Sequence, residues 1–190
     1  MDSDVSRLLR ETGENLLSLS QGSYCTAVER AVDVLEGAFR QGKTLLAFGN
    51  GGSSADAQHL CAELLGRFLI DRRPLPALAL TTNQAFLTAW SNDYRFDDVF
   101  ARQIEGHGGP GDVALGISTS GNSANVVQGL RRARELGLRT IGLSGSGGGL
   151  MVEHCDVLMS VPLNQTPRIQ EVHLATYHAI CEVLERRLFP

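Results

Sequence analysis

Hydroxyl side chains are concentrated in one short segment of the chain. Residues 116–123 read Gly-Ile-Ser-Thr-Ser-Gly-Asn-Ser, follow the apolar run 113–115 and precede a helix-like segment that starts near Ala124. A strand, a glycine-containing turn and a helix capped by Ser123 would direct several hydrogen-bond donors to the positive end of a helix dipole. That chemistry suits a phosphate group. An ordinary solvated turn rich in small residues stays open as the alternative.

Two common nucleotide motifs are disfavoured. The hydroxyl segment contains no basic residue and no Gly-Lys-Ser/Thr ending, so it is not a Walker A loop. A second small-residue turn, Gly49–Ser54, resembles the dinucleotide fingerprint, but Ser54 replaces its last glycine. The next predicted strand ends in Thr81-Thr82-Asn83, without a carboxylate for a ribose hydroxyl. We therefore expect a phosphorylated small molecule rather than a nucleotide.

Titratable side chains lie on two predicted helices. His59 and Glu63 are four residues apart, so they share a helix face and can address one ligand or metal, although such a pair is often only hydrogen-bonded. The last helix carries Gln170 and His178, eight positions apart, which is about 12 Å along a straight helix and about 80° in azimuth. If both bind one ion, either Gln170 precedes the regular helix or the two come from different copies of the chain.

The elements that position these residues follow from hydrophobic periodicity. Five short apolar runs alternate with helical patterns, which predicts a parallel sheet covered on both faces. Ligands of such sheets bind beyond the carboxyl ends of the strands, where strand order reverses. The expected strands are 44–48, 77–80, 113–117, 140–143 and 157–161, and the expected helices are 6–19, 24–40, 53–69, 84–90, 97–105, 123–136, 149–153 and 168–188.

Composition limits the class of protein. The chain has 190 residues, 43% of them hydrophobic, and a formal net charge of −4. This predicts one domain, 1–190, with N-terminal helices in 1–42 and a sheet core with the last helix in 43–190. A single lysine disfavours nucleic-acid binding. Four separated cysteines are typical of buried free thiols in a reducing compartment, and no signal peptide or membrane span is expected, which predicts a cytoplasmic protein.

Several segments together resemble the phosphoheptose isomerases, which are sugar isomerase (SIS) domain enzymes. The resemblance covers essentially the whole chain. Its motifs are Gly49–Ser53, Asp56–His59 with Glu63, Asn92-Asp93, Gly116–Val126 and Arg168–His173.

The resemblance implies an α/β fold with a flavodoxin-like five-stranded parallel sheet, and a homotetramer with active sites between subunits. It also implies conversion of sedoheptulose 7-phosphate to glycero-manno-heptose 7-phosphate for heptose and lipopolysaccharide biosynthesis. Glu63 and His178 would be the acid/base pair of an enediol mechanism. One zinc ion per subunit would be held by His59, Glu63, Gln170 and His178. Substrate would be bound by Asn50, Gly51, Gly52, Ser53, Glu63, Asn92, Asp93, Ser118, Thr119, Ser120, Ser123 and Gln170.

This chain departs from some family members at Pro167, where they carry an aspartate near the substrate. Glu171 and His173 are interpreted as structural hydrogen-bond partners. Two other functions remain: a non-catalytic SIS protein that binds a replication initiator or another protein partner, and a sugar-phosphate sensor. The initiator-binding relative lacks counterparts of Glu63 and His178, and a sensor is normally fused to a DNA-binding segment. The presence of Glu63 and His178 in this chain favours an enzyme.

Overall fold

A five-stranded parallel sheet forms the centre of the molecule in the computed structural model, which describes residues 3–190. The predicted fold class is confirmed. The strand order is β2-β1-β3-β4-β5. The strands are β1 (Leu45–Gly49), β2 (Ala77–Ala79), β3 (Val113–Ser118), β4 (Arg139–Ser144) and β5 (Val157–Ser160). β1, β3 and most of β4 are buried, as expected of runs covered on both faces.

The strand order reverses beside β1. From β1 the chain moves to β2 on one side and then crosses to β3 on the other, where Leu45 pairs with Ala77 and with Val113. The helices that follow β1 and β3 therefore leave the sheet in opposite directions. The glycine turn after β1 and the hydroxyl turn after β3 meet at this switch point.

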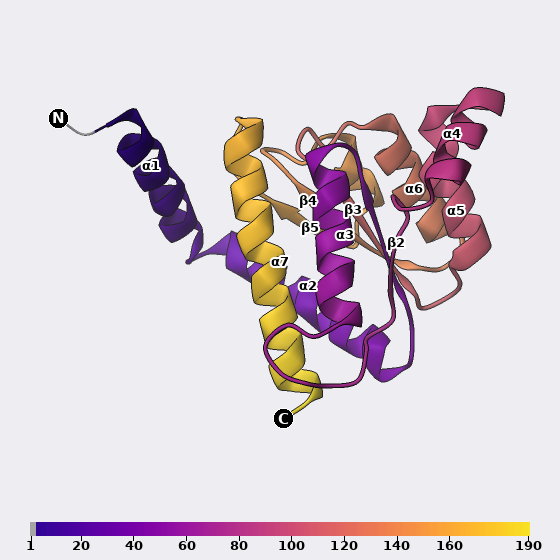
Figure 1. Ribbon diagram of the computed structural model, residues 1–190, viewed down its shortest axis with the longest axis horizontal. Helices are drawn as coiled ribbons and strands as arrows, with labels where there is room; N and C mark the ends of the chain where they lie inside the picture. The colour runs from indigo at the N-terminus through magenta and orange to yellow at the C-terminus, as the bar shows by residue number, and fades with distance from the viewer. Residues whose placement is uncertain (1–2) are drawn as a thin grey trace.

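Helices cover both faces of the sheet (Figure 1). One face is covered by α2 (Ser23–Arg40), α3 (Gly52–Leu65) and α7 (Thr166–Leu188). The other is covered by α4 (Gln84–Asp93), α5 (Val99–His107) and α6 (Ala124–Glu135), with the 3-10 segments η1 (Phe96–Asp98) and η2 (Gly149–His154). Among residues 3–190, no helix combines the length and apolar character needed to cross a bilayer.

The first helix, α1 (Asp4–Leu19), stands apart from the sheet, beyond α7 (Figure 1). Thr12 connects the two helices, because its hydroxyl donates to Glu171 at 2.8 Å and accepts from Arg168 at 2.7 Å. Glu171 is thus a hydrogen-bond partner, as interpreted from the sequence. Val5, Leu9 and Leu17 of α1 remain largely exposed in the single chain.

The predicted end of α3 at residue 69 is wrong. The helix ends at Leu65, and the chain turns away after Gly66. The cause lies at the other end of the sequence: the carboxylate of Glu185, on α7, accepts hydrogen bonds from the backbone N–H groups of residues 68, 69 and 70. These N–H groups would otherwise donate to carbonyls of a continuing helix.

A buried ion pair completes this arrangement. The side chains of Arg72 and Glu185 are 1% and 3% exposed, and Arg72 Nε lies 2.9 Å from Glu185 Oε1. Arg72 also donates to the carbonyls of Glu63 and Leu64, each at 2.8 Å, at the C-terminal end of α3. Burial opposes ionisation of Glu185, but the backbone donors and Arg72 outweigh it and hold its pKa below the ordinary value. The pair therefore joins α3 to α7.

We expect Arg72→Met to lower the free energy of unfolding by about 3–5 kcal/mol, because it leaves the Glu185 carboxylate buried with one fewer donor and no counter-ion. Urea unfolding at fixed protein concentration measures this change. The matched control is Arg95→Met, whose pair with Asp97 is exposed and screened by solvent, so its loss should change stability little. Equal effects of the two substitutions would contradict a structural role for the buried pair.

His173 is fully buried and neutral. Its Nε2 lies 3.3 Å from the carbonyl oxygen of Ser144, to which it donates, and its Nδ1 has no hydrogen-bond partner within residues 3–190. Burial lowers its pKa from 6.5 to about 4. The ring packs α7 against the end of β4, in agreement with the structural interpretation from the sequence.

His173 should make stability depend on pH. Between pH 6.5 and 4 the unfolded chain binds a proton at this ring that the folded chain does not, so the free energy of unfolding falls as pH falls, by about 3 kcal/mol over the window. Urea unfolding at a series of pH values, compared with His173→Gln, isolates this contribution. The variant should show a shallower dependence in that window; an unchanged slope would contradict the assignment.

The cysteines follow the sequence prediction in part. All four are free, and Cys61 and Cys181 are buried, but Cys25 and Cys155 are only half-buried. Burial raises the pKa of Cys61, Cys155 and Cys181 to about 12, which keeps these thiols protonated.

Candidate functional site

The hydroxyl turn gathers its side chains around Ser118. Ser118 Oγ, on a residue that is 3% exposed, lies 2.9 Å from Ser123 Oγ and 3.4 Å from Ser120 Oγ. Ser123 occupies the N-cap position of α6, as predicted, but its hydroxyl makes no capping hydrogen bond. The first N–H groups of α6 are therefore left without a side-chain cap, beside the cluster of hydroxyls. This geometry suits an anion.

Backbone contacts hold the hydroxyl turn in place. Gly121 has φ +67°, and a Cβ at this position would lie 2.1 Å from the carbonyl oxygen of Gly148. The side chain of Asn122 accepts a hydrogen bond from the N–H of Leu150 at 3.0 Å. The loop before η2 therefore fixes the shape of the turn, and only glycine fits at 121.

The glycine turn after β1 is hydrogen-bonded to the start of the helix that follows the hydroxyl turn. Asn50 and Asn125 exchange two amide hydrogen bonds, of 2.8 and 2.9 Å. Asn125 is buried on α6, directly after the hydroxyl turn. Sequence analysis assigned it no role, because its partner lies 75 positions away. The pair fixes the distance between the two turns.

Gln170 lies over the start of α3. A Cβ on Gly52 would be 2.2 Å from Gln170 Nε2, so the glycine makes room for this amide, and Ser53 beside it is buried. Gln170 lies within regular α7, which begins at Thr166. The possibility that it precedes the helix is therefore wrong. Within one chain it faces the glycine turn.

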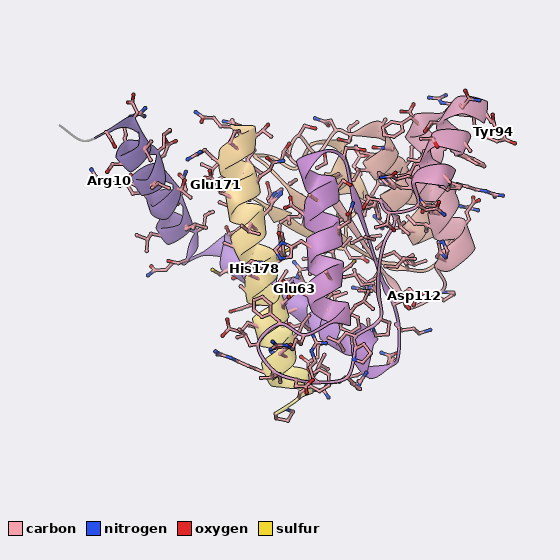
Figure 2. The ribbon with its side chains drawn as sticks, in the orientation of Figure 1. Arg10, Glu63, Tyr94, Asp112, Glu171 and His178 are labelled. Atoms are coloured by element: carbon pink, nitrogen blue, oxygen red, sulfur yellow. The ribbon has the colours of Figure 1, made fainter. Side chains whose placement is uncertain are left out.

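His59, Glu63 and His178 converge between α3 and α7. One ligand atom from each lies within 4.8 Å of the others. His59 Nε2 is 3.0 Å from Glu63 Oε1, and the two imidazole rings are perpendicular, with centroids 5.0 Å apart. Figure 2 shows Glu63 and His178 in the space between the two helices. His178 Nε2 is buried and has no hydrogen-bond partner within residues 3–190.

These three side chains could hold a metal ion. Two imidazole nitrogens and a carboxylate oxygen form a donor set that zinc accepts, and the unpartnered His178 Nε2 is an atom that a cation would satisfy. Gln170, the fourth predicted ligand, is not among them in one chain, since it lies about two helical turns, or 12 Å, from His178.

A buried tyrosine is hydrogen-bonded to His59. Tyr177 is 1% exposed, and its hydroxyl lies 2.9 Å from His59 Nδ1 and 3.5 Å from Asp56 Oδ1. Burial, followed by the nearby Asp56 charge, raises the pKa of Tyr177. Burial also raises the pKa of Asp56. Sequence analysis gave neither residue a role, although the spacing of Asp56 and His59, three apart on α3, places them on neighbouring parts of one helix face.

Asn92 and Asp93 lie in the exposed last turn of α4 and bond to each other at 2.9 Å. This helix packs on the opposite side of the sheet from α3 and α7. Their predicted contact with substrate stays a prediction.

The chain matches known proteins along its whole length. The SIS domain family model matches residues 11–145. A phosphoheptose isomerase of Geobacter sulfurreducens is 47% identical over 190 residues, covering 100% of both chains, and one of Synechocystis is 50% identical, covering 97% of this chain and 95% of that one. The chain belongs to the phosphoheptose isomerase family of SIS domain proteins.

A solved structure agrees with this family assignment. The phosphoheptose isomerase of Neisseria gonorrhoeae superposes with a TM-score of 0.90 at 38% identity, covering 96% of this chain and 97% of that one. The family model spans β1, β3, both turns and the His59–Glu63 pair, whereas His178 lies beyond its end at residue 145.

We expect Gly121→Ala to lower the free energy of unfolding. A left-handed backbone alone costs a residue with a Cβ about 1–2 kcal/mol. The loss should be clearly larger here, because the new methyl would also clash with the Gly148 backbone. The matched control is Gly147→Ala, which has φ +75° but no atom within 4 Å of its added Cβ. Urea unfolding of both variants measures the difference. Equal losses would contradict the idea that the Gly148 contact shapes the turn.

Proposed function

We propose that the protein isomerises sedoheptulose 7-phosphate to glycero-manno-heptose 7-phosphate through an enediol. The observation that carries this proposal is the convergence of His59, Glu63 and His178 within 4.8 Å, between α7 and a helix, α3, that begins at the glycine turn of the switch point. Relatives with the phosphoheptose isomerase name match the chain from end to end. His59 lies about 10 Å and Glu63 about 16 Å along α3 from Gly52, a separation that suits an elongated sugar phosphate.

The hydroxyl turn would hold the phosphate. Ser118, Thr119, Ser120 and Ser123 offer hydroxyl donors, and the uncapped start of α6 offers N–H groups and a positive dipole end. The sugar would lie against the glycine turn, where glycines allow close approach of the backbone. Its ligands would be Asn50, Gly51, Gly52, Ser53, Asn92, Asp93 and Gln170. Pro167 fits the first turn of α7 and supplies no carboxylate, so recognition would rest on these groups.

Glu63 and His178 would carry the protons. Aldose–ketose isomerisation moves one proton between C1 and C2 and another between the neighbouring oxygens. We assign the carbon-bound proton to the Glu63 carboxylate and the oxygen-bound proton to the His178 imidazole. No redox cofactor takes part, because the oxidation state is exchanged within the substrate.

One zinc ion per subunit would be held by His59, Glu63 and His178, with Gln170 of a second copy as the fourth ligand. When bound, it would polarise the substrate carbonyl or fix the geometry of its ligands. A glutamate that binds zinc is a weaker base than a free one. One nitrogen of His178 cannot hold zinc and carry a proton at the same time, so the two roles must be separated by experiment.

We propose that the protein acts as a homotetramer in the cytoplasm. Val5, Leu9 and Leu17 of the projecting helix α1 are exposed in the single chain, and assembly would bury them. A site formed between subunits would also let Gln170 bind the metal although it lies about 12 Å along α7 from His178 in its own chain. The four free cysteines agree with a reducing compartment.

The direct test is conversion of sedoheptulose 7-phosphate by the purified protein in D₂O, followed by NMR. An enediol intermediate predicts deuterium at the carbon that receives the proton. Glu63→Gln and His178→Gln should each lower kcat by about 10²–10⁴-fold, since each removes a proton-transfer group. Undiminished turnover in both variants would overturn the acid/base assignment, and absence of turnover by the unaltered protein would favour a protein-binding role.

Zinc content distinguishes the two roles of His178. If the imidazole carries a proton, His178→Gln saturated with zinc keeps its metal but not its turnover. If the imidazole acts only as a ligand, loss of activity follows loss of zinc, and excess zinc restores both. Metal analysis of each variant, purified without chelator, gives the answer.

A further inference from the structure

Tyr177 can share its hydroxyl proton with two partners. Its oxygen lies 2.9 Å from His59 Nδ1 and 3.5 Å from Asp56 Oδ1. A phenol has one proton, so it donates to only one of them at a time. The other oxygen of Asp56, Oδ2, is buried and has no hydrogen-bond partner within residues 3–190. The carboxylate is therefore poorly satisfied whenever the hydroxyl turns toward His59.

The tautomer of His59 decides which way the hydroxyl points. His59 Nε2 lies 3.0 Å from the Glu63 carboxylate, a contact in which Nε2 donates its proton and a neutral ring accepts at Nδ1 from Tyr177. A cation shared with Glu63 and His178 needs the Nε2 lone pair instead. The proton must then sit on Nδ1, which becomes a donor, and the Tyr177 oxygen must accept.

We propose that Asp56 and Tyr177 form a positioning relay that selects the metal-binding tautomer of His59. The inference rests on the metal site of the proposed function. When a cation binds, Nε2 releases its proton to solvent and Nδ1 takes one up, so the charge of the ring is unchanged. The Tyr177 hydroxyl rotates to Asp56, which gives this carboxylate a donor. The order of donation is then His59 Nδ1–H to Tyr177 oxygen, and Tyr177 O–H to Asp56.

Burial makes this relay selective. Tyr177 is 1% exposed, and the Asp56 Oδ2 atom is out of contact with solvent, so the hydroxyl proton has these two acceptors from α3 facing it. Without Asp56, the hydroxyl would donate to His59 Nδ1 and hold the proton on Nε2, the atom that a metal needs. Without the hydroxyl, the Nδ1–H of the metal-bound tautomer would lose its acceptor. Partners of this kind typically contribute 10–100-fold to metal affinity.

The test is zinc affinity of the full chain, measured by competition with a chromophoric chelator. We expect Tyr177→Phe to weaken zinc binding by about 10–100-fold. The matched control is Tyr24→Phe, which removes another phenol that bonds to α7, at Thr176 (2.7 Å), without touching His59. It should leave the affinity within threefold. Thermal unfolding of both variants checks that they fold.

A double-substitution cycle and a spectroscopic readout complete the test. Asp56→Ala should weaken zinc binding in the unaltered background and add little in Tyr177→Phe, because both act through one hydrogen-bond chain. In ¹⁵N-histidine NMR, the proton of His59 should be on Nε2 without zinc and on Nδ1 with zinc. Additive losses, an unchanged affinity of Tyr177→Phe, or a proton already on Nδ1 without zinc would overturn the relay alone. Absence of zinc binding by the unaltered protein would overturn the metal site and the relay together.

Discussion

The Glu185 carboxylate determines where α3 ends and how closely it lies to α7, and the candidate chemistry depends on that spacing. It accepts from three consecutive backbone N–H groups and from Arg72, which in turn donates to the carbonyls that α3 leaves unpaired at its C-terminal end. His59 and Glu63 lie on one of these helices and His178 on the other. Because Arg72 bonds to the carbonyl of Glu63 itself, the same network that stabilises the helix pair also holds a member of the triad.

The pair of turns at the switch point determines the other end of the site. The Asn50–Asn125 pair connects the glycine turn to the hydroxyl turn, and the Gly148 backbone supports the hydroxyl turn from outside. Since α3 starts at the glycine turn, its rise of about 1.5 Å per residue places His59 and Glu63 at fixed distances from that turn. Phosphate recognition and proton transfer are thus assigned to different elements, and a rigid helix sets the distance between them.

Sequence patterns predicted features that depend on neighbours along the chain and missed those that depend on distant ones. The five strands, the strand–turn–helix around Ser118 and the shared face of His59 and Glu63 are local, and the structure contains each of them. The end of α3 was misplaced because Glu185 lies more than 100 positions away. The hydroxyl of Ser123 was expected to cap α6, but Ser118 competes for it. The position of His178 beside the pair on α3 follows from helix packing, which periodicity does not specify.

The charge of the triad bears on what a bound cation could do. One carboxylate and two neutral imidazoles bring a single negative charge to a divalent ion, so a net positive charge would remain to act on a substrate carbonyl. A neutral amide such as Gln170 as the fourth ligand preserves that charge, whereas a second carboxylate would cancel it. Asp56 is close enough to support His59 but is separated from it by the Tyr177 hydroxyl. The intervening phenol therefore lets a half-buried carboxylate orient the imidazole without adding its charge to the ligand set.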